Sequence, residues 1–128
     1  MKPGLTEGLS ATMNVKVTSE MFAQFDGKVV HPAYSTVTMI YHMEWVSRQI
    51  ILPYLEEYEE GMGGSVCAKH LFPSREGTNL TITAVVFKLL KNTVFTEVTI
   101  KSNDKLIGIG EVKQIILSKN RIASLLVQ

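Results

Sequence analysis

The sequence predicts an α+β fold in which one long helix packs on one face of a curved antiparallel sheet of about five strands. Three observations lead to this prediction. One stretch, from about Ser35 to Leu52, carries apolar residues at the three- and four-residue spacing of a helix. One strand-like segment precedes it, and four follow it after short polar turns. At 128 residues, the chain is expected to form one domain over residues 1–128.

The segment before the helix is expected to contain a strand and then an irregular lid. In residues 6–18, Met13, Val15 and Val17 alternate with polar residues, which is typical of a half-buried strand. Residues 19–34 show no regular period but carry many large apolar side chains. A polar linker would not carry them, so this loop is predicted to pack over something, as a lid does.

The helix is predicted to be enclosed on most of its sides. Ser35 or Thr36 is expected to be its N-cap, and Pro53 limits its C-terminal end. Its main apolar face comprises Met39, Ile40, Met43, Val46, Ile50 and Ile51. Apolar residues also fall on other faces (Val37, Tyr41 and Trp45), which favours a helix that the sheet wraps rather than one lying on a surface.

Beyond the helix, the pattern indicates strands only. The acidic segment and residues 61–64, which are rich in glycine, are expected to break the chain first. The strands are predicted over residues 65–72, 80–90, 95–100 and 106–117. Gly108 and Gly110 suggest a bulge or a close backbone approach in the last of them. Val85 and Phe87 make both faces of their strand apolar, so a second buried surface and a homodimer are expected.

Composition excludes several classes of protein. Thirteen basic and twelve acidic side chains give a net charge of +1, so no overall field points to nucleic acid. The one cysteine, Cys67, excludes an internal disulfide and suits a reducing compartment. No secretory signal and no membrane-spanning apolar run is recognised, so a soluble, cytoplasmic protein is expected.

Three side chains predict chemistry on an acyl group. Glu44 lies in the middle of the apolar helix, where it is expected to be buried, and burying a carboxylate is costly unless it has a partner or a task. Thr36 precedes it by eight residues, and His70 lies on the next predicted strand. A hydroxyl, a carboxylate and an imidazole suffice for water-mediated or covalent hydrolysis of an activated acyl group.

The spacing of these residues restricts how they can meet. If both are helical, Thr36 and Glu44 lie about 12 Å apart along the axis, so they cannot touch within one helix. Either Thr36 lies in a turned-back segment before the helix, or the site combines residues of two subunits. On its strand, His70 is expected to share the inner face with Val66 and Ala68, whereas Cys67 points to the other face, which argues against a Cys–His pair.

Each of these residues also has a structural explanation. Glu44 could pair with Arg48 one helical turn away, His70 could be a satisfied core residue, and Thr36 could be a plain N-cap. His31 and His42 lack the partners at the spacing that a zinc site needs, so no metal is expected, and His42 is expected to be a packed helix residue.

The chain resembles the hot-dog fold thioesterases, most nearly the fluoroacetyl-CoA thioesterase-like branch. The resemblance rests on the Thr36-to-Glu44 spacing, on Gly63 seven residues before His70, and on the strand Ile107-Gly108-Ile109-Gly110. It implies an acyl-CoA thioesterase for a short- to medium-chain acyl group, with Thr36, Glu44 and His70 as catalytic residues. It also implies two subunits whose sheets pair into one continuous sheet, acyl-CoA at their interface, and no cofactor beyond the coenzyme A of the substrate.

The resemblance extends to binding residues, with departures. Substrate contacts are expected from Gly63, Gly64, Phe22, Phe25, Val30 and Gln114, and contacts to the CoA phosphates from Lys69, Arg75 and Lys101. The fluoroacetyl-specific enzyme has lid aromatics where this chain has Gly27 and Val30, and an arginine where it has Gln114. Relatives often carry a histidine at the position of Val112. The fluorine-selective gate is therefore not carried over, and a different acyl group is expected.

Other functions of the same fold stay open. A non-catalytic acyl-CoA-binding module would hold the thioester without cleaving it, and the missing arginine is compatible with that. A hydro-lyase would use an Asp–His pairing that is not found here, and a purely structural dimer would bind no ligand. The sequence does not assign the carrier, CoA or acyl-carrier protein, or decide between dimer and tetramer.

Overall fold

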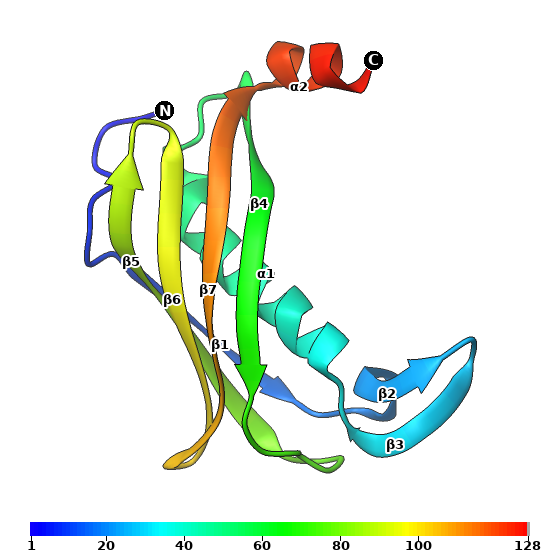
Figure 1. The fold of residues 1–128 in the computed structure, drawn as a ribbon. Helices are drawn as coiled ribbons and strands as arrows, with labels where there is room; N and C mark the ends of the chain where they lie inside the picture. Colours follow the sequence, from blue (N-terminus) through cyan, green and yellow to red (C-terminus); the bar gives the residue numbers. More distant parts are fainter. Residues whose placement is uncertain (128) are drawn as a thin grey trace.

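A five-stranded antiparallel sheet curves around one long helix in the computed structural model, which describes residues 1–127 (Figure 1). Across the sheet the strands are β1 (Ser10–Lys16), β5 (Asn79–Leu90), β6 (Thr93–Ser102), β7 (Lys105–Ser118) and β4 (Glu59–His70). The consecutive strands β5, β6 and β7 form a meander, so β1 and β4 are the two edges. The predicted α+β class with about five strands is confirmed.

The helix α1 (Thr36–Ile51) has the ends that its sequence specifies. The Ser35 side chain accepts a hydrogen bond from the Thr38 backbone N–H at 2.9 Å, so Ser35 is the N-cap. At the other end a 3-10 turn (Leu52–Tyr54) contains Pro53, which terminates the α-helical hydrogen bonding. The inner face of α1 packs on the concave face of the sheet. The buried core includes Met39, Met43, Val46, Ile51, Leu80, Ile82, Ala84, Val86, Val98 and Ile100.

The expectation that the helix is wrapped on most sides is wrong for a single chain. Val37 is 67% exposed, Tyr41 58% and Trp45 43%. The reason is geometric, because the sheet of one chain covers one side of α1 and then ends at the open edge of β4. An apolar helix face thus lies beside an unpaired strand edge.

Residues 19–34 are not irregular. They form a 3-10 turn (Ser19–Met21) and a hairpin of β2 (Phe22–Phe25) and β3 (Lys28–Tyr34), which extends away from the main sheet (Figure 1). Asp26 and Gly27 take positive φ values of 54° and 75° in its turn. Two register shifts at Ala23 interrupt the alternation along β2, which is why the sequence shows no strand period.

The glycine-rich segment is a strand, not a break. The strand β4 begins at Glu59 and runs through the glycines with a bulge between Gly63 and Ser65. Gly108 and Gly110 of β7 were predicted to mark a bulge or a close approach of the backbone, and the close approach is confirmed. A Cβ on Gly108 would lie 2.6 Å from Met39 Sδ, and a Cβ on Gly110 would lie 2.7 Å from Met43 Sδ. Glycine in these strands lets the helix approach the sheet.

A second helix was not predicted. The helix α2 (Lys119–Leu126) follows β7, and the Ser118 side chain caps it by accepting from the Arg121 backbone N–H at 3.0 Å. Within residues 1–127, no helix combines the length and apolar character that crossing a bilayer requires.

Candidate active site

Thr36 and His70 meet where α1 begins and β4 ends. Thr36 Oγ1 lies 2.9 Å from His70 Nδ1, within hydrogen-bonding distance. As predicted, Val66, Ala68 and His70 share the partly buried face of β4, and Cys67 is exposed on the other face. The structure therefore joins two of the three predicted catalytic residues within one chain.

A buried aromatic pair supports this contact. Tyr34 is 2% exposed, its hydroxyl lies 2.7 Å from His42 Nδ1, and its ring stacks on the His42 imidazole. Burial raises the pKa of Tyr34 and lowers the pKa of His42, so both side chains are held in their neutral forms. Which of them donates in this hydrogen bond depends on the tautomer of the imidazole. The Tyr34 ring also meets His70 edge-on at 5.9 Å between centroids.

This role of Tyr34 was not predicted, because no pattern distinguishes a buried residue at the end of an apparent loop from an exposed one. His42, however, is the packed helix residue that was expected. His42 holds Tyr34 through the stacked rings and the hydrogen bond, and Tyr34 in turn packs against the His70 imidazole.

The His70 imidazole is suited to accept a proton. Burial lowers its pKa, and the backbone of Phe72 partly offsets that effect by favouring the charged form. Its Nε2 atom is enclosed and makes no hydrogen bond of good geometry within residues 1–127. An open pocket of about 500 Å³ adjoins the ring; its lining includes Tyr34, Ser35, Thr36, His70, Leu71 and Phe72.

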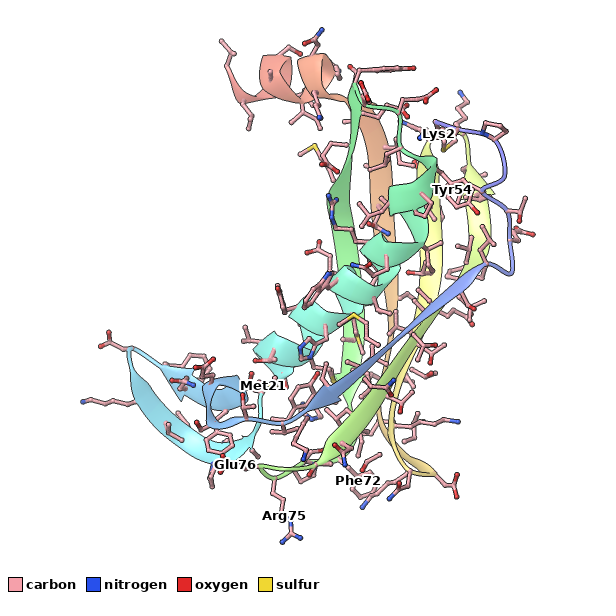
Figure 2. All side chains as sticks on the ribbon, turned by 180° about the vertical axis from the view of Figure 1, so that it is seen from behind. Lys2, Met21, Tyr54, Phe72, Arg75 and Glu76 are labelled. Carbon is pink, nitrogen blue, oxygen red and sulfur yellow. The ribbon has the colours of Figure 1, made fainter. Side chains whose placement is uncertain are left out.

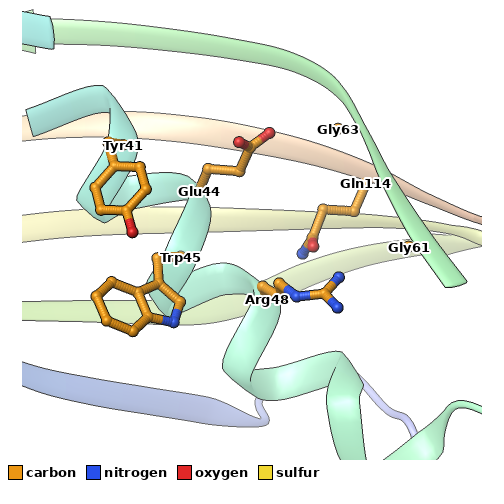
Figure 3. Close-up of a pocket in the computed structure, with 7 residues that line it drawn as sticks. All are labelled: Tyr41, Glu44, Trp45, Arg48, Gly61, Gly63 and Gln114. Carbon is orange, nitrogen blue, oxygen red and sulfur yellow. The ribbon is translucent and has the colours of Figure 1, made fainter. Parts of the chain in front are cut away.

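Glu44 lies in a different pocket, of about 480 Å³, farther along the helix (Figure 3). The expectation that Glu44 is buried is wrong for a single chain, because it lies on the helix face that the sheet leaves uncovered. Arg48 pairs with Glu60 at 2.9 Å instead of with Glu44. Within the described residues, Glu44 has no ion pair or hydrogen bond, so the purely structural pairing with Arg48 is not observed.

Gly63 and Gln114 form the other side of this pocket. They are directly opposite each other in the pairing of β4 with β7. A Cβ on Gly63 would overlap the Glu44 carboxylate, so the missing side chain makes room for the acid. Gln114 is 3% exposed, and its amide is directed into the pocket (Figure 3).

The two clusters do not meet within one chain. Thr36 is the first residue of α1 and Glu44 lies eight residues later in the same regular helix, so about 12 Å of axial rise separates them. A turned-back segment containing Thr36 is thus excluded. The other arrangement predicted from the spacing, a site shared between two subunits, stays a prediction.

The structure leaves the other predicted site residues apart from both clusters. Phe22 is half-buried against the core, whereas Phe25 and Val30 are exposed on the β2–β3 hairpin. Gly64 is exposed next to Gly63. The three basic residues expected at the CoA phosphates, Lys69, Arg75 and Lys101, are all exposed, and Arg75 projects outward beyond Phe72 (Figure 2). Their roles stay predictions.

Comparisons with known proteins agree with the fold. The model of the FlK family, described as fluoroacetyl-CoA-specific thioesterase, matches residues 17–120. The comparison with curated proteins found no match. Among solved structures, a Thermus thermophilus hypothetical protein of the thioesterase superfamily is 38% identical, with a TM-score of 0.92 over 97% of this chain and 92% of its own.

Two further structures are similar at lower identity. The fluoroacetyl-CoA thioesterase FlK is 21% identical, with a TM-score of 0.88 over 98% of this chain and 97% of its own. A hot-dog-like protein from Thermanaerovibrio acidaminovorans is 18% identical, with a TM-score of 0.87 over 98% and 90%. Variants of FlK have been solved with fluoroacetate and CoA and with acetyl-CoA. The expected hot-dog fold is confirmed.

Proposed function

The chain belongs to the family of fluoroacetyl-CoA-specific thioesterases, which are thioester hydrolases, and from this membership we propose that it hydrolyses a short- to medium-chain acyl-CoA thioester. The observation that carries the proposal is that the structure contains two partial sites. In one, Thr36 is within hydrogen-bonding distance of His70, and in the other the Glu44 carboxylate lies over Gly63 without a hydrogen bond to any described residue. Coenzyme A enters as part of the substrate, and a soluble, cytoplasmic enzyme is proposed.

The working enzyme is a homodimer whose sheets join along β4. The open edge of this strand lies beside the exposed apolar side chains of Val37, Tyr41 and Trp45, and exposed edges of this kind are sites of strand pairing. Along one β4, Gly63 and His70 are about 23 Å apart at ~3.3 Å per residue. Antiparallel pairing reverses the partner strand, which brings His70 closer to the partner subunit's Glu44.

Each side chain then has a task. Glu44 acts on the thioester carbonyl, either as the nucleophile or as the base that takes a proton from the attacking water. The neutral His70 moves a proton, and the departing sulfur of CoA is released as the thiol. Thr36 orients the imidazole through its hydroxyl, and the free N–H groups of the α1 N-terminus favour a polarised carbonyl oxygen.

Binding groups lie around this centre. Gly63, Gly64 and Gln114 are proposed to line the acyl group, and Phe22, Phe25 and Val30 of the hairpin are proposed to cover it. Lys69, Arg75 and Lys101 are exposed cations, which suits contacts with the phosphates of CoA.

Thiol release from acetyl- to decanoyl-CoA tests the proposal. The wild type, Glu44→Ala and His70→Ala are compared, with circular dichroism to verify that the variants fold. We expect release by the wild type and a fall of about 10²- to 10⁴-fold in both variants. Absence of release from every acyl-CoA, together with thermal stabilisation by CoA thioesters, would instead favour the acyl-CoA-binding module.

A further inference from the structure

The pocket beside Glu44 has a polar floor that a plain alkyl chain would not satisfy. Gln114 is 3% exposed and its amide contributes to the lining. Gln114 Nε2 makes no hydrogen bond within residues 1–127. An enclosed amide without a partner is costly, so a ligand that bonds to it gains about ten- to a hundredfold in affinity over one that does not.

Two further groups make the same region polar. The position that a Cβ of Gly61 would occupy lies 3.9 Å from Gln114 Oε1 and 3.7 Å from Arg48 Nη1. The same position lies 2.5 Å from Ile51 Cδ1, so the Ile51 side chain fills the space over Gly61, and the two polar atoms lie at its edge. Arg48 and Gln114 both line the pocket beside Glu44, so a guanidinium and an amide are the polar groups at this end of it.

The charges around this space select among polar groups. Arg48 Nη2 already pairs with Glu60 at 2.9 Å, and the Glu44 carboxylate lines the same pocket. A second carboxylate here would face Glu44 while Arg48, the cation in the pocket lining, is already paired with Glu60, so it would be repelled. A hydroxyl both donates and accepts, so it can bond to the Gln114 amide in either orientation of the amide.

We propose that Gln114 selects acyl-CoA substrates with a hydroxyl group on C2 or C3 of the acyl chain over unsubstituted chains of equal length. The position of the hydroxyl on the acyl chain follows from the pairing of β4 with β7. Gly63, which lies under Glu44, is the direct cross-strand partner of Gln114. Partner Cα atoms lie about 5 Å apart, which matches one or two bonds beyond the thioester carbon. This inference rests on the proposed function and specifies its substrate class.

The test compares kcat/KM for butyryl-CoA with that for both enantiomers of 2-hydroxybutyryl- and 3-hydroxybutyryl-CoA. We expect the wild type to prefer at least one hydroxyacyl-CoA by tenfold or more, and Gln114→Met, which keeps the length of the side chain, to abolish that preference. Thr96→Val is the matched control. It removes a buried hydroxyl that bonds to Ser47 at 2.7 Å outside the pocket lining, so the preference should persist.

Two results would overturn the inference. The first is that the wild type shows no preference for a hydroxyacyl-CoA or prefers butyryl-CoA. The second is that Gln114→Met lowers kcat/KM equally for all substrates, which would mean that Gln114 only supports Glu44. If the wild type cleaves no thioester, the proposed function fails separately. Calorimetric binding of butyryl- and hydroxybutyryl-dethia-CoA, whose CH₂ replaces the sulfur, then decides about Gln114. If the wild type binds a hydroxybutyryl analogue at least tenfold more tightly than the butyryl analogue, and Gln114→Met does not, the inference about Gln114 is supported. If the wild type binds both analogues equally, the inference is wrong.

Discussion

The two halves of the candidate site differ in how far one chain completes them. His70 is half-buried, bonded to Thr36 and packed against Tyr34, so its geometry is set by its own subunit. Glu44 is exposed, has no polar partner among the described residues and lies beside an open strand edge. The imidazole half is therefore formed within one chain, whereas the carboxylate half is open in one chain and would be enclosed only in the proposed dimer.

Mixed dimers give the largest expected effect. Glu44→Ala and His70→Ala are each expected to lose nearly all activity, but a dimer with one chain of each type would have one intact shared site and one that lacks both groups. After unfolding and refolding an equal mixture, half of the dimers are mixed, so about a quarter of the wild-type thiol release should return. The measurement is the rate of thiol release before and after the exchange.

A site contained within one chain would give no recovery at all in that experiment. The matched control is the mixture of each variant with itself, taken through the same refolding. Recovery there would point to contamination by the wild type and not to a shared site.

The carboxylate half can be tested without removing the carboxylate. In Gly63→Ala the new methyl group overlaps the Glu44 carboxylate and displaces it, so kcat/KM should fall by about 10²-fold with little loss of stability. Ser65→Ala is the control, because Ser65 is exposed in the same strand and has no proposed part in the site. Equal kcat/KM values in the two variants would show that the position of Glu44 is unimportant.

Elements with a clear period could be predicted from the sequence. The helix between Ser35 and Pro53 and the strands from residue 79 onward lie where their patterns placed them, because one face of each is buried in the core of its own chain. The hairpin was missed because bulges at Ala23 break its alternation. The glycines of β4 were predicted to break the chain because glycine is common in turns. Their role in the strand is to make room for Glu44 and Ile51, and it can be recognised only once the contacts between the helix and the strand are known.

The contacts within the candidate site could be predicted only in part. Spacing and residue type singled out Thr36, Glu44 and His70 as candidates, and the structure joins the first and the last. The exposure of Glu44 was missed because the apolar residues Val37, Tyr41 and Trp45 predicted that this helix face is buried. The pattern does not distinguish burial by the same chain from burial by another molecule. Tyr34 was missed because a packing role leaves no motif.

The imidazole half can be weakened at one hydrogen bond. Thr36→Val removes the hydroxyl that holds His70 Nδ1, and we expect kcat to fall by about tenfold while stability changes little, since Thr36 is not the N-cap. Ser35→Ala does the reverse: it removes the cap and costs about 1 kcal/mol of unfolding free energy. Denaturant unfolding and kcat are measured on both, and a stability loss in Thr36→Val equal to that in Ser35→Ala would make Thr36 a structural residue.

The next prediction concerns the buried pair of Tyr34 and His42 and its effect on stability in acid. Burial lowers the pKa of His42 below its unfolded value, so the unfolded chain binds more protons at low pH. Stability is therefore fully present above about pH 6.5 and falls as the pH drops below it. Tyr34→Phe leaves His42 Nδ1 buried without its hydrogen-bond partner and should cost about 1–3 kcal/mol, whereas Tyr54→Phe, at the far end of α1, should cost less.

The double variant Tyr34→Phe/His42→Leu separates the hydrogen bond from the packing. It replaces both partners by apolar groups, so it should regain stability over Tyr34→Phe and show a weaker loss between pH 7 and pH 5. Urea unfolding across that range provides the measurement. If the double variant keeps the full pH dependence, His42 is not its source. His70, whose pKa burial also lowers, then becomes the titrating group, and the preformed half of the site would itself limit stability in acid.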